Sequence, residues 1–230
     1  MNVALHLSDG IVDAPTSLAY ALVAAIGLAV AAAGARADLD ERTAPMAGLV
    51  AAFVFAAQMV NFPVLPGVSG HLLGGALAAI LVGPWVGALC VGIVVVMQAV
   101  LFADGGLSAL GANITNLALA GTAAGYGVAT LLRRLARRGR SGLIAVAFAG
   151  ALVGSVAAAA SFVVQYAIGG DAGVATGSVA IALLGVHVLI GVGEGVITAL
   201  TVGAVARVRP DLVHLLRAGR RPAAGAAVAR

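Results

Sequence analysis

The feature that most constrains this chain is the recurrence of apolar runs close to twenty residues long over almost its whole length. An α-helix needs about 20 apolar residues to cross the hydrocarbon layer of a bilayer. Hydrophobic residues make up 62% of the 230 residues and charged residues only 10%, whereas soluble domains carry about 25% charged residues. The sequence therefore predicts an all-α, polytopic membrane helical bundle.

The apolar runs predict seven membrane-spanning helices. The third and fourth share one apolar stretch that is divided only at Gly83-Pro84, where a helix is expected to break or kink. Two short or tilted spans fit into that stretch. The expected spans are residues 14–35, 44–61, 71–84, 85–103, 112–132, 142–169 and 178–206.

The basic residues test this count, because arginine and lysine concentrate in the cytoplasmic loops of membrane proteins. The chain has no lysine, and its 13 arginines occur between the first and second spans, between the fifth and sixth, and after the seventh. Seven spans place all of them on one side of the membrane. We therefore expect the N-terminus outside the cell, the C-terminus inside it, and a location in the inner (plasma) membrane.

Two regions follow from this pattern. Residues 1–206 are expected to form an integral membrane domain, and residues 207–230 a basic, disordered cytoplasmic tail. We interpret the arginine clusters as topology signals and expect no nucleic-acid partner. Cys90 is the single cysteine, which excludes an internal disulfide and a cysteine-based metal site within one chain. The sequence has no Gly-Lys-Ser or Gly-Lys-Thr phosphate loop, so any dependence on ATP would come from a partner.

Most polar residues in or beside the spans fall near their extracytoplasmic ends, and such clusters mark substrate pathways in membrane proteins. His187 lies about 13 Å below the start of the seventh span, and Glu194 lies nearer the bilayer centre on the same helix face. We favour a structural or ligand-orienting role for these two and assign none to His214. The residues that converge are His6, Asp9, Gln58, Asn61, Ser69, His71, Gln98, Asn113, Asn116 and His187.

The imidazoles of His6 and His71, with carbonyls and amides nearby, suit a transition metal such as Co²⁺, Ni²⁺ or Zn²⁺. The alternative for any single amide is a helix–helix hydrogen bond worth only about 0.6 kcal/mol. A hydrolase is a second alternative, because Gly67-Val68-Ser69-Gly70 matches the Gly-x-Ser-Gly pattern of rhomboid-like intramembrane serine hydrolases. Ser69 would then be the nucleophile, with His187 on a later helix.

Three blocks of the sequence resemble signature regions of the CbiM/NikM family, and the resemblance covers residues 5–206 in order. It implies the substrate-binding membrane component of an ATP-driven energy-coupling factor importer for Co²⁺ or Ni²⁺, which is not itself an enzyme and carries no resident cofactor. The implied partners are a transmembrane coupling protein, ATPase subunits and a small accessory membrane protein. The blocks are AAFVFAAQMVNFPVLPGVSGHLLGGALAAILVGPW (51–85), DGGLSALGANITN (104–116) and HVLIGVGEGVIT (187–198), with HLSDGIVDAP resembling the family's His-Ile-Pro-Asp-Gly start.

The resemblance also implies a metal site. Family members begin Met-His, and the metal takes the terminal amine together with the amide and imidazole nitrogens of that histidine. A second histidine at the start of a later helix completes four nitrogens, which suits square-planar Ni²⁺. The matching residues here are Leu5, through its backbone, His6 and His71. The residues expected to orient these ligands are Asn61, Ser69, Gln98 and Asn113.

The N-terminus departs from the family pattern, because Met1-Asn2-Val3-Ala4 precede Leu5 and His6 is not the second residue. A misassigned start, cleavage after Ala4 and an altered site are the three accounts. Leucine codons CTG and TTG can start translation in bacteria and are then read as methionine, so we favour a start at position 5. Leu5 belongs to the ligand set on that condition.

Overall fold

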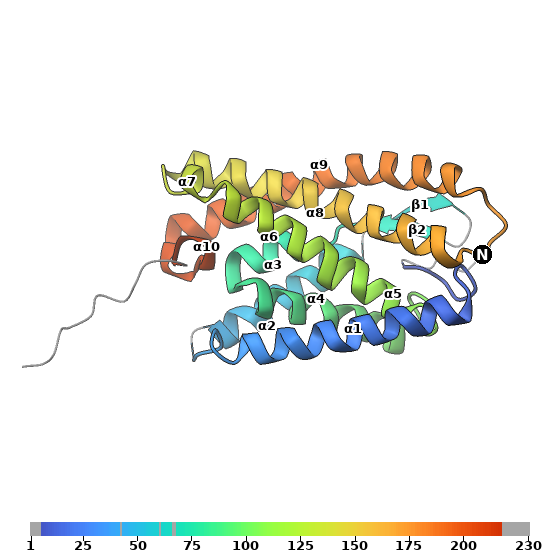
Figure 1. Ribbon diagram of the computed structural model, residues 1–230. Coiled ribbons are helices and arrows are strands. Elements are labelled where there is room, and N and C mark those ends of the chain that lie inside the picture. Colours follow the sequence, from blue (N-terminus) through green and yellow to red (C-terminus); the bar gives the residue numbers. More distant parts are fainter. Residues whose placement is uncertain (1–5, 42, 60, 66–67, 218–230) are drawn as a thin grey trace, which may run out of the picture.

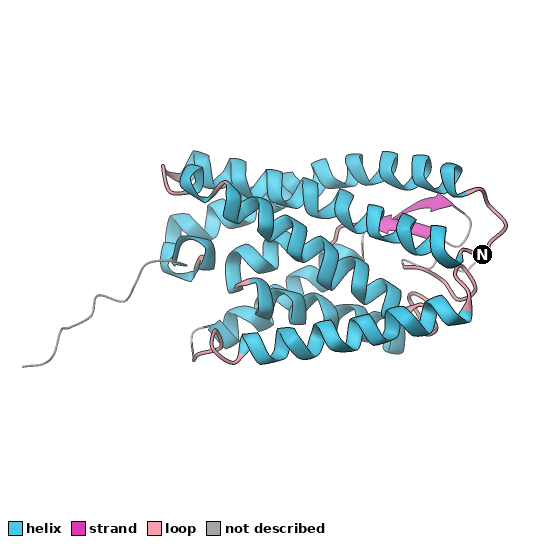
Figure 2. Ribbon diagram, viewed as in Figure 1, coloured by secondary structure: helices cyan, strands magenta, loops and turns pink. Residues whose placement is uncertain are grey.

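Figure 1 shows the computed structural model, which describes residues 6–41, 43–59, 61–65 and 68–217. These residues form a helical bundle with one small antiparallel sheet near one of its ends (Figure 2). Within them, four helices are long and apolar enough to cross a membrane, namely α1 (Ala14–Ala35), α4 (Pro84–Leu101), α8 (Arg140–Gly169) and α9 (Thr176–Val208). The further elements are α2 (Thr43–Gln58), β1 (Asn61–Leu65), β2 (Val68–His71), α3 (Gly75–Val82), α5 (Leu110–Ile114), the π-helix η1 (Thr115–Gly121), α6 (Thr122–Leu131), α7 (Arg133–Ala136), the short 3-10 helix η2 (Pro210–Leu212) and α10 (His214–Arg217).

The first, fourth, sixth and seventh expected spans correspond to the four long helices. The fifth is helical over its predicted length, but it consists of α5, η1 and α6 in succession. Within the π-helix, the carbonyl oxygen of Leu117 accepts from the side-chain hydroxyl of Thr122 at 3.2 Å. The predicted break at Gly83-Pro84 is also present, because Gly83 has a φ of +97° and α4 begins at Pro84.

The expectation of a helix over residues 71–84 is wrong at its beginning. The chain forms a β-hairpin up to His71, with Asn61 opposite His71 in the register, and α3 starts only at Gly75. Pro63 lacks the N–H that a helix would use, and Gly74 has a φ of +77°, a left-handed conformation that favours glycine. All eight residues of α3 are buried, so protein, and not lipid, surrounds this interrupted segment, as bilayer physics requires.

The helices α6 and α8 pack with their backbones close together. A Cβ atom added at Gly154 would lie 2.8 Å from the carbonyl oxygen of Gly121, and one added at Gly150 would lie 2.9 Å from that of Gly125. Small residues permit such close contact between membrane helices. This contact fixes α8 against η1 and α6, and both α8 and η1 carry part of the cavity wall described below.

The bundle has two different ends (Figure 1). The N-terminal segment, the hairpin and α5 lie at one end, and α7 and α10 lie at the other. At the first end, the N–H of Asp13 donates to the carbonyl oxygen of Gly169 at 2.7 Å, and Val12 forms a bridge with Gly170. These bonds hold the start of α1 beside the end of α8.

The structure corrects the expected boundary between residues 206 and 207. Helix α9 continues to Val208, and the segment that follows packs Val213 and Leu215 into the main core with no exposed area. The ring of His214 lies 6.2 Å from that of Tyr126. The expectation of a disordered tail therefore fails for residues 207–217, since apolar side chains there anchor the segment; residues 218–230 lie outside the described part of the chain.

Candidate metal centre

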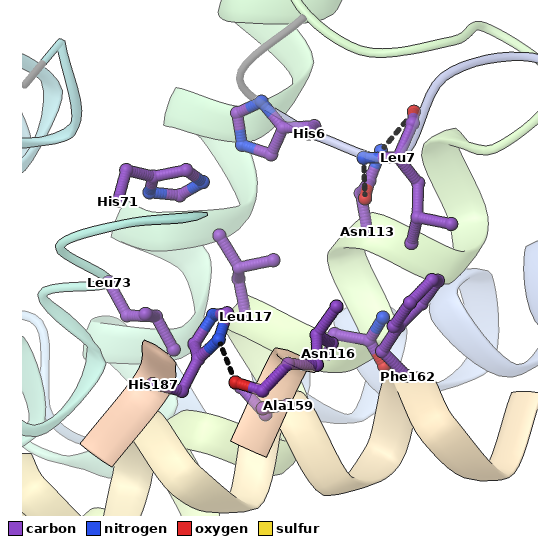
Figure 3. Close-up of a pocket in the computed structure, with 12 residues that line it drawn as sticks. His6, Leu7, His71, Leu73, Asn113, Asn116, Leu117, Ala159, Phe162 and His187 are labelled. Atoms are coloured by element: carbon purple, nitrogen blue, oxygen red, sulfur yellow. Dashed lines mark hydrogen bonds between the residues drawn. The ribbon is translucent and has the colours of Figure 1, made fainter. Parts of the chain in front are cut away.

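A cavity of about 50 Å³ lies at the end of the bundle that holds the N-terminal segment and the hairpin (Figure 3). This is several times the roughly 10–15 Å³ that one water molecule needs. Its walls come from the N-terminal segment, the β2–α3 region, α5, η1, α8 and α9. The polar residues that line it are His6, His71, Asn113, Asn116 and His187.

His6 and His71 lie next to each other at the cavity wall, with their ring centroids 4.6 Å apart. Both are almost completely buried. The Nδ1 atom of His6 lies 3.4 Å from a carboxylate oxygen of Asp104, whose side chain is also buried. A carboxylate beside a histidine commonly orients an imidazole that binds a metal. The arrangement therefore brings two imidazoles close enough to bind one ion.

The main chain next to His6 is held by Asn113. The Oδ1 atom of Asn113 accepts from the N–H of Leu7 at 3.1 Å, and its Nδ2 atom donates to the carbonyl oxygen of Leu7 at 3.2 Å. That carbonyl also accepts from the N–H of Gly106 at 2.8 Å. Gly105 has a φ of +91°, and a Cβ there would lie 2.7 Å from the Cβ of His6. Close approach of this loop to the histidine thus requires glycine.

The main chain after His71 is held by two buried side chains from different helices. Gln58 at the end of α2 donates through Nε2 to the carbonyl oxygen of Leu73 at 2.7 Å. The Glu194 carboxylate of α9 accepts from the N–H groups of Leu73 and Gly74 at 3.1 and 2.9 Å. A carboxylate at these N–H groups also favours the start of α3. Glu194 thus holds the main chain between His71 and α3, a position that fits the structural or ligand-orienting role that the sequence favours for it.

Two of the histidines share a hydrogen-bonding pattern. The Nδ1 atom of His71 lies 2.8 Å from the carbonyl oxygen of Leu72, and that of His187 lies 2.9 Å from the carbonyl oxygen of Leu183. A carbonyl only accepts, so each Nδ1 atom carries the proton and each Nε2 atom keeps its lone pair. This is the tautomer that binds a metal through Nε2.

The residues expected to orient the ligands have different positions. Asn113 lines the cavity, whereas Gln98 is buried in α4 away from it, and its side-chain amide has no hydrogen-bond partner among the described residues. The main-chain carbonyl of Gln98 accepts from the N–H of Asp104 at 3.0 Å, which links it indirectly to His6. Asn61 and Ser69 lie in β1 and β2, with Ser69 opposite Pro63, and Leu5 lies outside the described residues.

Sequence reasoning gave too little weight to Asp104 and Gln165. Asp104 has no role in the sequence-based site, although the block DGGLSALGANITN contains it together with Asn113 and Asn116. The Nδ2 atom of Asn116 donates to Oε1 of Gln165 at 2.9 Å, and Gln165 is completely buried in α8. A glutamine inside a long apolar run is a signal that could have identified it.

Two aspartates fasten the N-terminal segment outside the long helices. Asp9 accepts from the hydroxyl and the N–H of Ser108, and these bonds, the hydroxyl first, lower the pKa of Asp9 below its ordinary value. Asp13 caps α1 by accepting from the N–H of Thr16 at 2.8 Å. Hydrogen bonding by Thr16 lowers the pKa of Asp13. Both carboxylates are therefore ionised at neutral pH.

Within the described part of the chain, no group of three or more His, Cys, Asp and Glu side chains is placed to hold a metal ion. The two neighbouring imidazoles of His6 and His71 would thus need ligands of another kind, such as main-chain nitrogens, amide oxygens or water. Imidazole and amide donors of this kind suit Co²⁺ and Ni²⁺.

Comparison with solved structures gives the class of protein. The chain is similar to the crystal structure of a transition metal transporter, with a TM-score of 0.81 and 27% identity over 88% of this chain and 93% of that one. A truncated transition metal transporter gives a TM-score of 0.80 and 26% identity over 88% of this chain and 98% of the other. Together with the apolar helices, this defines an integral membrane protein of metal transport.

Sequence comparison then gives the family. Residues 6–212 match the cobalt uptake substrate-specific transmembrane region, and the chain belongs to this family, CbiM. It is 30% identical to the cobalt transport protein CbiM of Sorangium cellulosum over 94% of this chain and 97% of that protein. It is 34% identical to the fused nickel transport protein NikMN of Rhodobacter capsulatus over 80% of this chain and 57% of that one. The predicted resemblance is confirmed, and the chain is a cobalt or nickel transport component; the rhomboid-like alternative at Ser69 has no support.

Proposed function

We propose that this protein is the substrate-binding membrane component of an ATP-driven energy-coupling factor importer and captures Co²⁺ or Ni²⁺ at the extracytoplasmic end of its bundle. The observation that carries the proposal is the pair of buried imidazoles, His6 and His71, 4.6 Å apart at the wall of a cavity. Family membership supports the choice of ion, because the relatives are named for cobalt and nickel transport. ATP hydrolysis would be the task of partner subunits.

The proposed ligands are the imidazoles of His6 and His71 and main-chain nitrogens at the start of the chain, with Leu5 supplying a terminal amine if translation begins there. Four nitrogens in one plane would suit Ni²⁺. Asn113 would orient His6 by holding the main chain of Leu7, and Gln58 and Glu194 would orient His71.

The proposed topology has seven spans in the inner (plasma) membrane, with the N-terminus outside and the C-terminus inside. Support comes from the two ends of the bundle, since α7 and α10 carry arginines at the end opposite the hairpin. A transmembrane coupling protein and ATPase subunits, with a small accessory membrane protein, are the proposed partners. Their contact surfaces would lie on this bundle.

Titration of the purified protein with Co²⁺ or Ni²⁺ tests the proposed function. His71→Ala should lower the affinity at least tenfold, because it removes a ligand, while the protein still elutes as a folded monodisperse species. Ser69→Ala, two residues earlier in the same strand, is the comparison variant and should lower the affinity less than His71→Ala, because Ser69 is expected to orient a ligand and not to bind the ion. Equal affinities in the wild type and His71→Ala would refute the assignment of His71.

Two chain lengths test the N-terminal ligand. A protein that begins at position 5 with methionine offers a free amine next to His6, whereas one that retains Met1-Asn2-Val3-Ala4 offers only an amide there. The longer form should bind Ni²⁺ at least tenfold more weakly, or about 1.4 kcal/mol. The shorter form should release more protons on binding, because amine and amide nitrogens lose theirs to the metal. Equal affinity and proton release would exclude the terminal amine as a ligand.

A further inference from the structure

We infer that the cavity contains a second, inner position for the transported ion, formed by Nε2 of His187 and Oδ1 of Asn116. The inference rests on the proposed function, because it concerns the ion after His6 and His71 have bound it. His187 extends from α9 into the same cavity, and Figure 3 shows it below His71 and farther from His6. An ion bound there would therefore occupy a place distinct from the proposed outer site.

His187 has the features of a metal-binding imidazole. It lines the cavity and is 8% exposed. Its Nδ1 atom donates to the carbonyl oxygen of Leu183, so the lone pair of Nε2 is free to bind a metal ion. The hydroxyl of Ser155 in α8 donates to the carbonyl oxygen of His187 at 3.3 Å and fixes this turn of α9. The imidazole is thus held in position before any ion arrives.

Asn116 supplies the second, independent observation. It lines the same cavity, and its Nδ2 atom donates to Oε1 of Gln165. The Nε2 atom of Gln165 in turn donates to the carbonyl oxygen of Ala112 at 3.5 Å. The Oδ1 atom of Asn116 is buried and has no hydrogen-bond partner among the described residues. A buried acceptor without a partner is unfavourable, and a bound cation would satisfy it. Asn116 also lies in the π-helix η1, and π-helical segments are frequent at functional sites.

The chemistry of the two donors fits the same ions as the outer site. An imidazole nitrogen and an amide oxygen both bind Co²⁺ and Ni²⁺, and water would complete the coordination shell in the remaining volume. With two protein ligands the inner position binds more weakly than the outer one. Two divalent ions in one small cavity repel each other strongly, so a single ion occupies the two positions in turn. A weaker second position allows release after capture.

The test uses the double variant His6→Ala/His71→Ala, which lacks the proposed outer ligands, and Co²⁺ as the probe. Absorption titration should detect residual binding at least tenfold weaker than in the wild type. Adding His187→Ala should weaken it at least tenfold further. Adding His214→Ala is the matched control, because this histidine lies in α10 at the opposite end, and it should leave the residual binding unchanged. Asn116→Asp should instead strengthen residual binding, since it adds a charged oxygen ligand.

In the wild-type background, His187→Ala should retain tight Co²⁺ binding within about threefold but reduce uptake by cells that contain the partner subunits at least fivefold. Residual binding that is absent, or insensitive to His187, overturns the inner position and leaves the proposed function intact. Loss of tight binding in His187→Ala to the level of His71→Ala also overturns it, because His187 would then belong to the outer site. A wild-type protein that binds no Co²⁺ or Ni²⁺ refutes the proposed function itself. Gel filtration checks the folding of each variant. If His187→Ala aggregates, His187→Gln takes its place.

Discussion

The two histidines that meet at the cavity are held by the protein in different ways. The chain after His71 is bonded to α2 and α9 through Gln58 and Glu194, which are 0% and 3% exposed. The chain after His6 is bonded to Asn113 and the loop before α5. Asp9, three residues beyond His6, is fastened at the exposed rim by Ser108.

The two segments differ in how strongly their hydrogen bonds stabilise the fold before an ion binds. A buried carboxylate that accepts from two N–H groups contributes strongly, because leaving those groups without partners in the interior is costly. A neutral amide contributes less, and an exposed carboxylate contributes least. We therefore infer that His71 is part of the folded framework, whereas the N-terminal segment is the part whose position depends more on the ion.

Among the residues that hold these two segments, Glu194 should give the largest effect on stability when it is changed to alanine. Two buried N–H groups, of Leu73 and Gly74, would lose a charged acceptor, with an expected cost of about 3 kcal/mol or more. In a chain of this size that corresponds to a fall of roughly 10 °C in the unfolding temperature, measured in detergent by circular dichroism. Co²⁺ affinity should fall as well, because His71 loses its support.

Glu194→Gln is the control for that variant. It keeps one oxygen acceptor and the side-chain volume, so its unfolding temperature should lie between those of the wild type and Glu194→Ala. An unchanged unfolding temperature in Glu194→Ala would show that the bonds to Leu73 and Gly74 do not stabilise the fold, and the contrast between the two histidine segments would disappear.

Asn113→Ala should affect binding more than folding. The N–H and the carbonyl of Leu7 would both lose a partner, and Co²⁺ affinity should fall about tenfold, the usual scale for residues that orient a ligand. The unfolding temperature should fall much less than in Glu194→Ala. Asn113→Asp retains the acceptor for the N–H of Leu7 but not the donor, and should have an intermediate affinity. Equal losses of unfolding temperature in Asn113→Ala and Glu194→Ala would contradict the comparison.

Asp9→Asn should have the smallest effect, with less than about 1 kcal/mol lost because the group is exposed. Since hydrogen bonding lowers the pKa of Asp9, its contribution is present above the ordinary value of about 3.9 and is lost only as the pH falls through the lower folded value. Between pH 5 and 8 the variant and the wild type should therefore show parallel Co²⁺ affinity curves. A separation of the curves that grows within this range would show a stronger role for the rim.

Sequence reasoning identified the long helices well, because α1, α8 and α9 are uninterrupted apolar runs. It failed at the hairpin before α3, where apolar residues in an extended conformation look like the beginning of a span. The late start of α3 goes with long-range bonds from Leu73 and Gly74 to Gln58 and Glu194, and periodicity does not contain such information. The mixture of α5, η1 and α6 was likewise invisible, since π-helical turns have no distinct hydropathy period.

The candidate site was predictable in its histidines but not in their supports. His6 and His71 stood out as imidazoles near span ends and as matches to a family pattern. The side chains that hold these segments bond to main-chain atoms of Leu7 and Leu73. Every residue has such atoms, so the residue types at positions 7 and 73 do not predict these bonds. Val213 and Leu215 were missed for a related reason, because a short apolar pair among arginines is a weak signal until the core that receives it is known.

The bonds to Leu73 have a thermodynamic consequence beyond support. A single residue accepts from α2 at its carbonyl and donates to α9 through its N–H, so the separation of these two helices and the position of His71 are linked variables. Linkage is reciprocal: if an ion bound by His71 favours one separation of α2 and α9, any partner that changes this separation changes the affinity for the ion by the same free energy. Capture and release could then be controlled from the flanks of the bundle, without contact at the metal.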